Sequence, residues 1–381
     1  MSASPSPIRR SLPHRAVDVQ LSKSGVILIL VKDAHQQSQL LGYSLRGEHL
    51  FQHNLPDNSI GIQSASEEEV WVGTPNSLER FNSKGEHLQA IVLLCEENEQ
   101  LDAFLPTPDG EFICALQALP DGEVRGRVLR LDADGSEHWS LDLYPYDLAY
   151  GGVIQASRDS GWEIRPKPAW EARSWTTACQ QPLLLSGNCL IAAYEEMPGS
   201  GLGRIYGIEA ATGRLRWSTK PRPYSNKAVA GHERFLIGSQ GYGAFETWLY
   251  NARGEILQHW PSHGYYLPLE NGEIRVVEME NRVPSRSHVV IFKPDGTVTK
   301  GPHLPGYYTT YPVLDEENNI IFWRGQELLL IDKDLNKQVL YTDPNVPDSF
   351  FPSRLLSNQE GNFVFAAQEE LWIFEQLHGK R

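Results

Sequence analysis

The sequence has few cysteines and no long apolar run. Its 381 residues include four cysteines, and none forms a CxxC pair or a Cys/His ligand spacing: Cys95, Cys114, Cys179 and Cys189. Cys114 and Cys189 lie within apolar stretches, so we expect buried, reduced thiols. No segment approaches the roughly 20 apolar residues that cross a bilayer, and residues 1–10 carry no apolar signal region. We therefore expect a cytoplasmic protein.

The sequence also has fewer basic than acidic residues. Lys and Arg total 34 against 48 Asp and Glu, so the formal charge is -14 and the pI is near 5.3. Nucleic acids and anionic membranes both require a basic face, so we expect neither as a partner. A basic or neutral protein remains a compatible partner. The alternative is that the acidity only keeps the protein soluble.

Motifs for catalysis or cofactor binding are scarce. There is no GxSxG sequence, and the glycine-rich stretches 198–203 and 239–243 do not lie between a strand and a helix, as nucleotide-binding loops do. His259 and His263 are four residues apart, but no helix is expected there to align them for a metal. We therefore assign no catalytic residue and expect no metal and no cofactor.

The sequence does have one recurring phrase: an apolar strand, a polar turn with glycine, and a second strand that often carries Trp. These turns end at Gly47, Gly85, Gly135, Gly213, Gly254, Gly296, Asn336 and Gly379. A second series of turns precedes other apolar runs, at Gly25, Gly110, Gly187, Gly231, Gly272, Asn319 and Gly361. Gly and Asn suit tight hairpins because they adopt positive φ cheaply. Repetition at about 40 residues indicates an array.

Each repeat has room for a four-stranded antiparallel sheet with strands A to D. Such sheets bury both faces when they stack around an axis, and this predicts an all-β fold of the β-propeller type. The eight turns of the first series predict eight blades, with seven as the alternative. An open β-solenoid is the other architecture to consider. We expect a single domain over residues 1–381.

The two ends of the chain predict how the array closes. The last copy of the phrase stops at Gly379, before a fourth strand, and a strand without a sequence neighbour is expected at residues 8–12, IRRSL. We expect residues 8–12 to complete the last blade, which removes an exposed edge strand.

One interval, from Gly135 to Gly213, is long enough for a blade and an insertion. We place the insertion at residues 144–178, in the D–A loop between the third and fourth blades. Its aromatic and basic residues include Tyr146, Trp162, Arg165, Trp170, Arg173 and Trp175. Trp and Arg dominate binding hot spots, so these side chains are candidate anchors for a partner. Alternatively, the rings form a small core within the insertion.

Further aromatic residues occur at the other D–A junctions. They are Tyr224, Tyr265, Tyr266, Tyr307, Tyr308, Tyr311, Phe350 and Phe351. At these positions they would line the mouth of a central channel, a setting that suits a peptide, a sugar or a planar ligand. The alternative is that they pack between blades.

Two segments resemble the pyrroloquinoline-quinone-like repeat: residues 128–139, VLRLDADGSEHW, and residues 205–217, IYGIEAATGRLRW. The resemblance implies the quinoprotein-like or WD40-like propeller superfamily, in which the Trp docks on the neighbouring blade. Several enzymes of that superfamily use two adjacent cysteines over the quinone, and this chain has none. The resemblance therefore implies the non-catalytic scaffold type, in a bacterial protein.

Together these features predict non-enzymatic recognition of a protein or peptide by the loop-rich aromatic face. The residues we expect to carry it are Trp162, Arg165, Trp170, Arg173, Trp175, Tyr146, Tyr266 and Tyr308. One alternative is an enzyme that acts on a glycan or small molecule at the axial mouth, with Asp147, Glu270 and Asp348 as candidate carboxylates. Another is a propeller subunit of a larger bacterial complex or conflict system. The sequence does not predict an oligomeric state.

Overall fold

The protein is built from β-strands and tight turns. The computed structural model describes residues 6–64, 66–96, 99–118, 126–143, 183–197, 202–220, 222, 224–241, 244–278, 287–304, 310–346, 355–358 and 361–375. These residues contain no helix. Across the same described ranges, nothing helical is therefore long and apolar enough to pass through a membrane.

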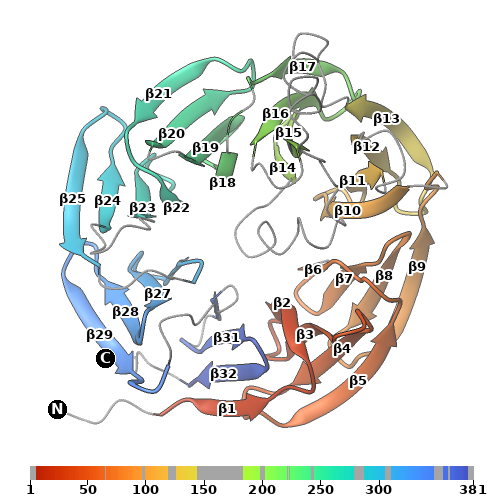
Figure 1. The fold of residues 1–381 in the computed structure, drawn as a ribbon, viewed down its shortest axis with the longest axis horizontal. Helices are drawn as coiled ribbons and strands as arrows, with labels where there is room; N and C mark the ends of the chain where they lie inside the picture. Colours follow the sequence, from red (N-terminus) through yellow and green to blue (C-terminus); the bar gives the residue numbers. More distant parts are fainter. Residues whose placement is uncertain are drawn as a thin grey trace, which may run out of the picture. The chain divides into compact units, whose positions relative to one another are not determined.

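The strands form eight four-stranded antiparallel sheets, the blades of a β-propeller (Figure 1). Seven blades consist of four consecutive strands. The eighth has the order β1-β32-β31-β30, in which the first strand of the chain completes the last sheet. The predicted all-β fold and the blade count of eight are thereby confirmed.

The chain divides into two compact units, which we describe separately. The first unit comprises residues 1–74, 78–90 and 264–381. It contains blades 1, 6, 7 and 8 and most of blade 2. Blade 1 consists of β2 (Arg15–Leu21), β3 (Ile27–Lys32), β4 (Ser38–Tyr43) and β5 (His49–Leu55), and blade 2 of β6 (Gly61–Ser64), β7 (Glu69–Gly73), β8 (Ser77–Asn82) and β9 (His87–Val92). Blade 6 consists of β22 (Gly264–Pro268), β23 (Ile274–Glu278), β24 (His288–Phe292) and β25 (Val298–His303), and blade 7 of β26 (Val313–Leu314), β27 (Ile320–Arg324), β28 (Glu327–Ile331) and β29 (Lys337–Thr342). Blade 8 consists of β30 (Leu356–Ser357), β31 (Phe363–Ala367), β32 (Glu370–Phe374) and β1 (Ile8–Ser11).

The second unit comprises residues 75–77 and 91–263. It contains blades 3, 4 and 5. Blade 3 consists of β10 (Glu99–Pro106), β11 (Phe112–Ala118), β12 (Gly126–Leu131) and β13 (Glu137–Leu143). Blade 4 consists of β14 (Leu183–Ser186), β15 (Cys189–Met197), β16 (Leu202–Glu209) and β17 (Leu215–Ser218). Blade 5 consists of β18 (Tyr224–Val229), β19 (Arg234–Gly241), β20 (Ala244–Asn251) and β21 (Ile256–Trp260). A single domain over the whole chain stays a prediction.

The middle strands of each blade are buried on both faces, whereas the fourth strand is a half-exposed edge. All five residues of β31 are buried, while β5 alternates between exposed and partly buried positions. Within a unit, the apolar faces of neighbouring sheets pack together: Ile29 of blade 1 shares a cluster with Val364 of blade 8. Sheets with two apolar faces can bury both only by such stacking, which is why the chain repeats them.

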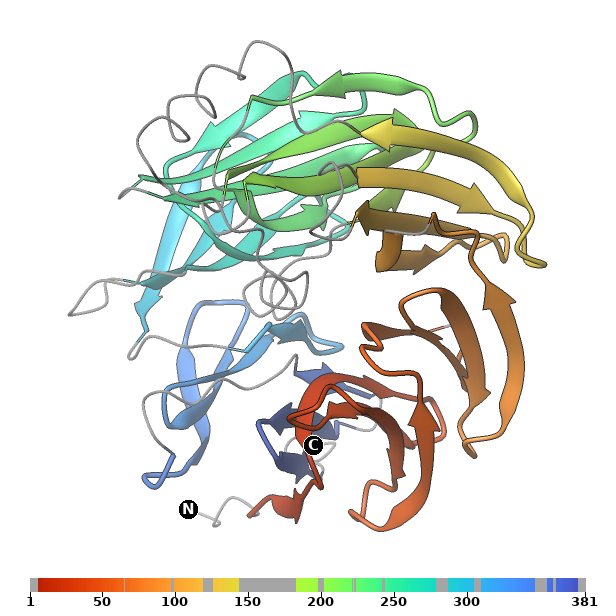
Figure 2. The ribbon, with the colours of Figure 1, turned by 45° about the vertical axis from the view of Figure 1, so that its right-hand side comes forward.

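The first strand of the chain, β1, pairs with the last strand, β32, as predicted. Strand β1 runs antiparallel to β32, with Ile8 opposite Ile373 and Ser11 opposite Glu370 (Figures 1 and 2). Without β1, the edge of β32 would expose unpaired N–H and C=O groups to other chains.

The signature glycines within the described residues have positive φ, as expected, but blade 7 departs from the prediction. Its left-handed residues are Asn318 (φ 62) and Leu335 (φ 66), not Asn319 and Asn336. In the second of these turns, Oδ1 of Asp332 accepts the N–H of Asn336 at 2.8 Å. The same cap closes the blade-2 turn, where Oδ1 of Asn82 accepts the N–H of Glu86 and Gly85 is left-handed. The blade-7 turn therefore has the ordinary geometry, with Leu335 at the position that glycine occupies in blade 2.

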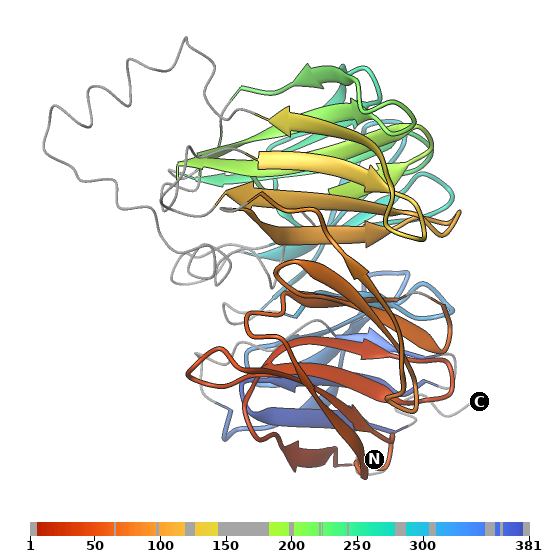
Figure 3. The same cartoon turned by 90° about the vertical axis from the view of Figure 1, so that its right-hand side faces the viewer.

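In the second unit, the repeat tryptophans dock on the next blade. Trp139 donates its indole N–H to the carbonyl oxygen of Ala210 at 2.9 Å, and Trp217 does the same to Ala252 at 3.0 Å. The edge strand β13 that carries Trp139 is drawn in yellow in Figure 3. This confirms the docking that the repeat resemblance implied. Gly213 lies directly under the Trp139 ring, where a Cβ would come within 2.6 Å of it.

Candidate functional site

Most of the predicted recognition residues lie outside the part of the chain that the structure describes. Tyr146, Trp162, Arg165, Trp170, Arg173 and Trp175 fall within residues 144–182, and Tyr308 falls within residues 305–309. Their role in binding a partner stays a prediction. Tyr266 is described and lies in β22, where its side chain is buried.

At the described D–A junctions of the first unit, the predicted aromatic residues are buried or partly buried. Tyr265 is buried, and its ring centroid lies 4.4 Å from that of Tyr311. Tyr266 is buried beside it in the same strand. These three rings therefore follow the packing alternative more closely than an open lining.

A buried arginine lies near these rings, and the sequence analysis missed it. Arg324 ends β27, is fully buried, and donates through Nη1 to the carbonyl oxygen of Glu278 at 3.2 Å. Burial lowers the pKa of Arg324 to about 10, although Tyr265 and Glu278 act in the opposite direction. Because the side chain is fully enclosed, we assign it to joining blade 6 to blade 7, not to direct contact with a ligand.

A more accessible group of aromatic and charged side chains lies in the second unit, on blade 5. We call Arg222, Glu246, Trp248 and His259 the blade-5 cluster. The Cζ atom of Arg222 lies 4.8 Å from the Trp248 ring centroid, and His259 stacks on the same indole with centroids 5.6 Å apart. Glu246 pairs with Arg222 at 3.1 Å and with His259 at 3.3 Å.

The register of two strands explains why these residues meet. Trp248 in β20 is directly opposite His259 in β21. Glu246 and Trp248 are two residues apart in β20, so their side chains point to the same face of the sheet. Arg222 comes just before β18, at the D–A end of the blade, where Tyr224 also meets the Trp248 ring edge-on, at 6.3 Å.

The blade-5 cluster combines a buried ring with accessible charges. The indole of Trp248 is nearly buried, whereas the side chains of Arg222 and His259 are 46% and 45% exposed. Ion pairs at such exposure contribute little to stability, so Glu246 orients the side chains of Arg222 and His259 without locking them in place. The cluster can therefore exchange these contacts for those of a bound partner.

Lys227 and His263 are buried basic groups of the same unit. Burial lowers the pKa of Lys227 to about 8 and that of His263 to about 3. Both side chains are enclosed and neither reaches the surface. Of the cysteines that the structure describes, Cys114 and Cys189 are buried free thiols, as expected, and burial raises the pKa of Cys189 to about 11.

The enzyme alternative relied in part on Glu270. That residue lies in the hairpin between β22 and β23, is exposed, and follows the A strand of blade 6. An A–B hairpin and a D–A loop are at opposite ends of an A strand, so Glu270 does not lie at the D–A end. The other two candidates, Asp147 and Asp348, lie outside the described residues.

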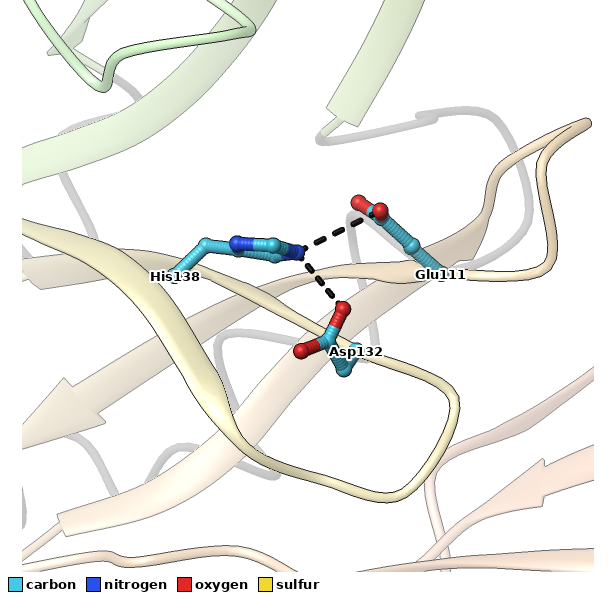
Figure 4. A group of neighbouring side chains, drawn as sticks. All are labelled: Glu111, Asp132 and His138. Carbon is cyan, nitrogen blue, oxygen red and sulfur yellow. Dashed lines mark ion pairs between the residues drawn. The ribbon is translucent and has the colours of Figure 1, made fainter.

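One group of side chains in the described ranges has the composition of a metal site: Glu111, Asp132 and His138 of blade 3 (Figure 4). Sequence analysis did not identify it, because its members are far apart in the chain.

Comparison with known proteins supports no assignment beyond the fold. No family model and no curated protein matches the chain. Among solved structures, virginiamycin B lyase from Staphylococcus aureus is 13% identical, with 97% of this chain and 98% of that chain covered and a TM-score of 0.49. The WD40 domain of Neurospora crassa Pan2 is 10% identical, with 99% of each chain covered and a TM-score of 0.47. BBS1N in complex with ARL6DN is 11% identical, with coverages of 97% and 95% and a TM-score of 0.47.

These similarities are too distant to transfer an activity or a partner, and propellers host many unrelated functions. The sheet topology of the chain itself identifies it as a β-propeller with eight four-stranded blades.

Proposed function

We propose that this chain is a non-enzymatic scaffold that recognises a protein or peptide through the D–A side of its blades. The observation that supports this most directly is the blade-5 cluster. Trp and Arg are the residues most enriched at binding hot spots, and here they occur together with half-exposed charges.

The blade-5 cluster is suited to a peptide segment for a physical reason. The Trp248 indole is held between neighbours, so it loses little side-chain entropy when a partner arrives. Arg222 already lies over the ring, and its planar guanidinium can donate to backbone carbonyl or carboxylate oxygens of the partner. The surrounding chain is acidic, with a net charge of -14, which favours a basic or neutral partner overall.

The predicted insertion at residues 144–178 would add to this surface. In the sequence it falls between β13 and β14, and its three Trp residues are candidate anchors of the same chemical type. The scaffold type, the cytoplasmic location and the bacterial origin stay predictions, as do the enzyme and larger-complex alternatives.

The test is to identify a partner by native pull-down and mass spectrometry and then to measure its affinity for variants. We expect Arg222→Ala, Trp170→Ala and Trp175→Ala each to weaken binding by about fivefold or more, which corresponds to about 1 kcal/mol. Arg214→Ala is the matched control, because Arg214 is an exposed, ion-paired arginine in a C–D turn at the other end of a blade. It should leave binding unchanged.

A purified chain that turns over a glycan or small molecule would contradict the proposal. So would a partner whose affinity responds to Arg214→Ala but to none of the other three substitutions.

A further inference from the structure

We propose that Glu111, Asp132 and His138 form a binding site for a divalent first-row metal ion such as Zn²⁺. The Nε2 atom of His138 lies 2.6 Å from Oδ1 of Asp132 and 3.3 Å from Oε1 of Glu111. Figure 4 shows both carboxylates directed at this one ring nitrogen. All three ligand atoms lie within 4.8 Å of one another.

The strand pairing of blade 3 brings the three residues together. Phe112 is opposite Leu131 in the pairing of β11 with β12. Glu111 and Asp132 are the next residues outward from that pair, so their side chains meet beyond the end of the two strands. His138 reaches them from β13, where a bulge after Arg130 shifts the register of the edge strand.

The ligand types favour a transition ion over Mg²⁺ or Ca²⁺. Imidazole nitrogen with carboxylate oxygen is a donor set typical of Zn²⁺ and its first-row neighbours, whereas Mg²⁺ and Ca²⁺ prefer all-oxygen sites. The ion would bind Nε2 of the neutral imidazole in place of a proton, with the remaining ring proton on Nδ1. Three protein ligands leave a coordination position for water.

Arg130 positions one of the ligands. Its Nε pairs with Oε2 of Glu111, and its Nη2 pairs with Asp109 at 2.9 Å. This holds the carboxylate of Glu111 with its other oxygen toward His138. Asp109 and Asp134 lie in the two turns beside Glu111 and Asp132, and the added negative charge favours a cation at this end of the blade.

Charged side chains near this turn in other blades form single ion pairs instead. In blade 4, Arg216 takes the place of His138 and pairs with Glu209 at 2.8 Å; a guanidinium cannot bind a metal ion. In blade 2 the corresponding position is Leu88, and the neighbouring His87 pairs with one carboxylate, that of Glu79, at 2.6 Å. Among the residues described, blade 3 alone brings a histidine to two carboxylates.

The experiment is a calorimetric titration of the metal-stripped full chain with Zn²⁺. We expect one equivalent to bind with a Kd in the micromolar range and to bind at least about tenfold more tightly than Mg²⁺ or Ca²⁺. His138→Ala, Asp132→Asn and Glu111→Gln should each weaken Zn²⁺ binding by about tenfold or more.

His87→Ala is the matched control, because the side chains of His87 and His138 are 41% and 43% exposed and each forms a 2.6 Å carboxylate pair. It should bind Zn²⁺ like the wild type. Circular dichroism of each variant checks folding, and Asp132→Asn serves if His138→Ala does not fold.

Either of two results would contradict the proposed site. The wild type could bind Zn²⁺ no more tightly than the folded blade-3 variants do, or His87→Ala could lose as much Zn²⁺ affinity as His138→Ala. Because the blade-5 cluster takes no part in this titration, the outcome is independent of the proposed recognition function.

Discussion

Arg9 of the first strand lies over the ring of Trp372 in the strand that it pairs with, with its Cζ atom 3.7 Å from the ring centroid. Arg9 also forms an ion pair with Asp343, whose side chain is only 4% exposed. The N-terminal strand is therefore held by a ring of blade 8 and a carboxylate of blade 7, in addition to its backbone hydrogen bonds.

We expect Arg9→Ala to lower the free energy of unfolding by about 2 kcal/mol. The substitution removes a cation–π contact and leaves the Asp343 carboxylate without its cationic partner. Arg9→Lys keeps the charge but not the planar stack, so its loss should be smaller. Deleting residues 1–13 should cost more than either substitution. Urea unfolding measures all four chains, and a wild-type value for Arg9→Ala would contradict the prediction.

The same pair predicts a dependence on pH. Burial acts to raise the pKa of Asp343, but the N–H of Asn345 and the guanidinium of Arg9 outweigh it, so the pKa lies below its ordinary value. A carboxyl group with a lowered folded-state pKa stabilises the protein above its unfolded pKa of about 3.9 and loses this effect as the pH falls through the folded value.

The difference in unfolding free energy between wild type and Arg9→Ala should therefore become smaller as the pH falls below 5. Urea titrations at several pH values test this. In Asp343→Asn, which carries no titratable group at this position, the effect of Arg9→Ala should be small and independent of pH in that range.

Gly213 should tolerate alanine less well than Gly296 does. Both glycines have positive φ, +71° and +86°, so alanine strains the backbone by about 1 kcal/mol in each turn. At Gly296 a Cβ meets nothing within 4 Å, whereas at Gly213 it would press on the Trp139 ring. We expect Gly213→Ala to cost about 1–2 kcal/mol more than Gly296→Ala, because the hydrogen bond from Trp139 to Ala210 is also disturbed.

Thermal or urea unfolding of the two variants gives this comparison. In a Trp139→Ala background, the difference between the two glycine substitutions should largely disappear, since the obstructing ring is gone. Equal costs in the wild-type background would contradict the assigned role of Gly213.

His263 should make the protein sensitive to acid. Burial lowers its pKa to about 3, so it stays neutral in the folded protein while the unfolded chain takes up a proton below about pH 6.5. The unfolded state then binds more protons, and the free energy of unfolding falls as the pH decreases, by about 1.4 kcal/mol per pH unit for this one group.

We expect His263→Gln to remove this contribution between pH 6 and pH 4. The measurement is the slope of unfolding free energy against pH, compared with the wild type. His259→Gln is a suitable control, because His259 is half-exposed in the same segment. If both variants keep the wild-type slope, the assignment to His263 is wrong.

The architecture could be predicted from the sequence because hairpin chemistry is local. A glycine that must adopt positive φ marks a turn wherever it occurs, so the spacing of Gly47, Gly85 and Gly135 already gave the size of a blade. The same reasoning misplaced the turns of blade 7 by one residue. There Leu335 takes the left-handed position that Gly85 has in blade 2, a conformation that its own type disfavours.

The candidate sites depended on the tertiary structure. Arg222 and Trp248 are 26 positions apart, and Glu111 and His138 are 27 apart. Nothing in the order of residues shows that they meet, because contact requires the strand register, the bulge in β13 and the loop that leads into β18. The repeat determined how many sheets this chain forms. Cross-strand pairing, which is non-local, decided which side chains each sheet brings together at its ends.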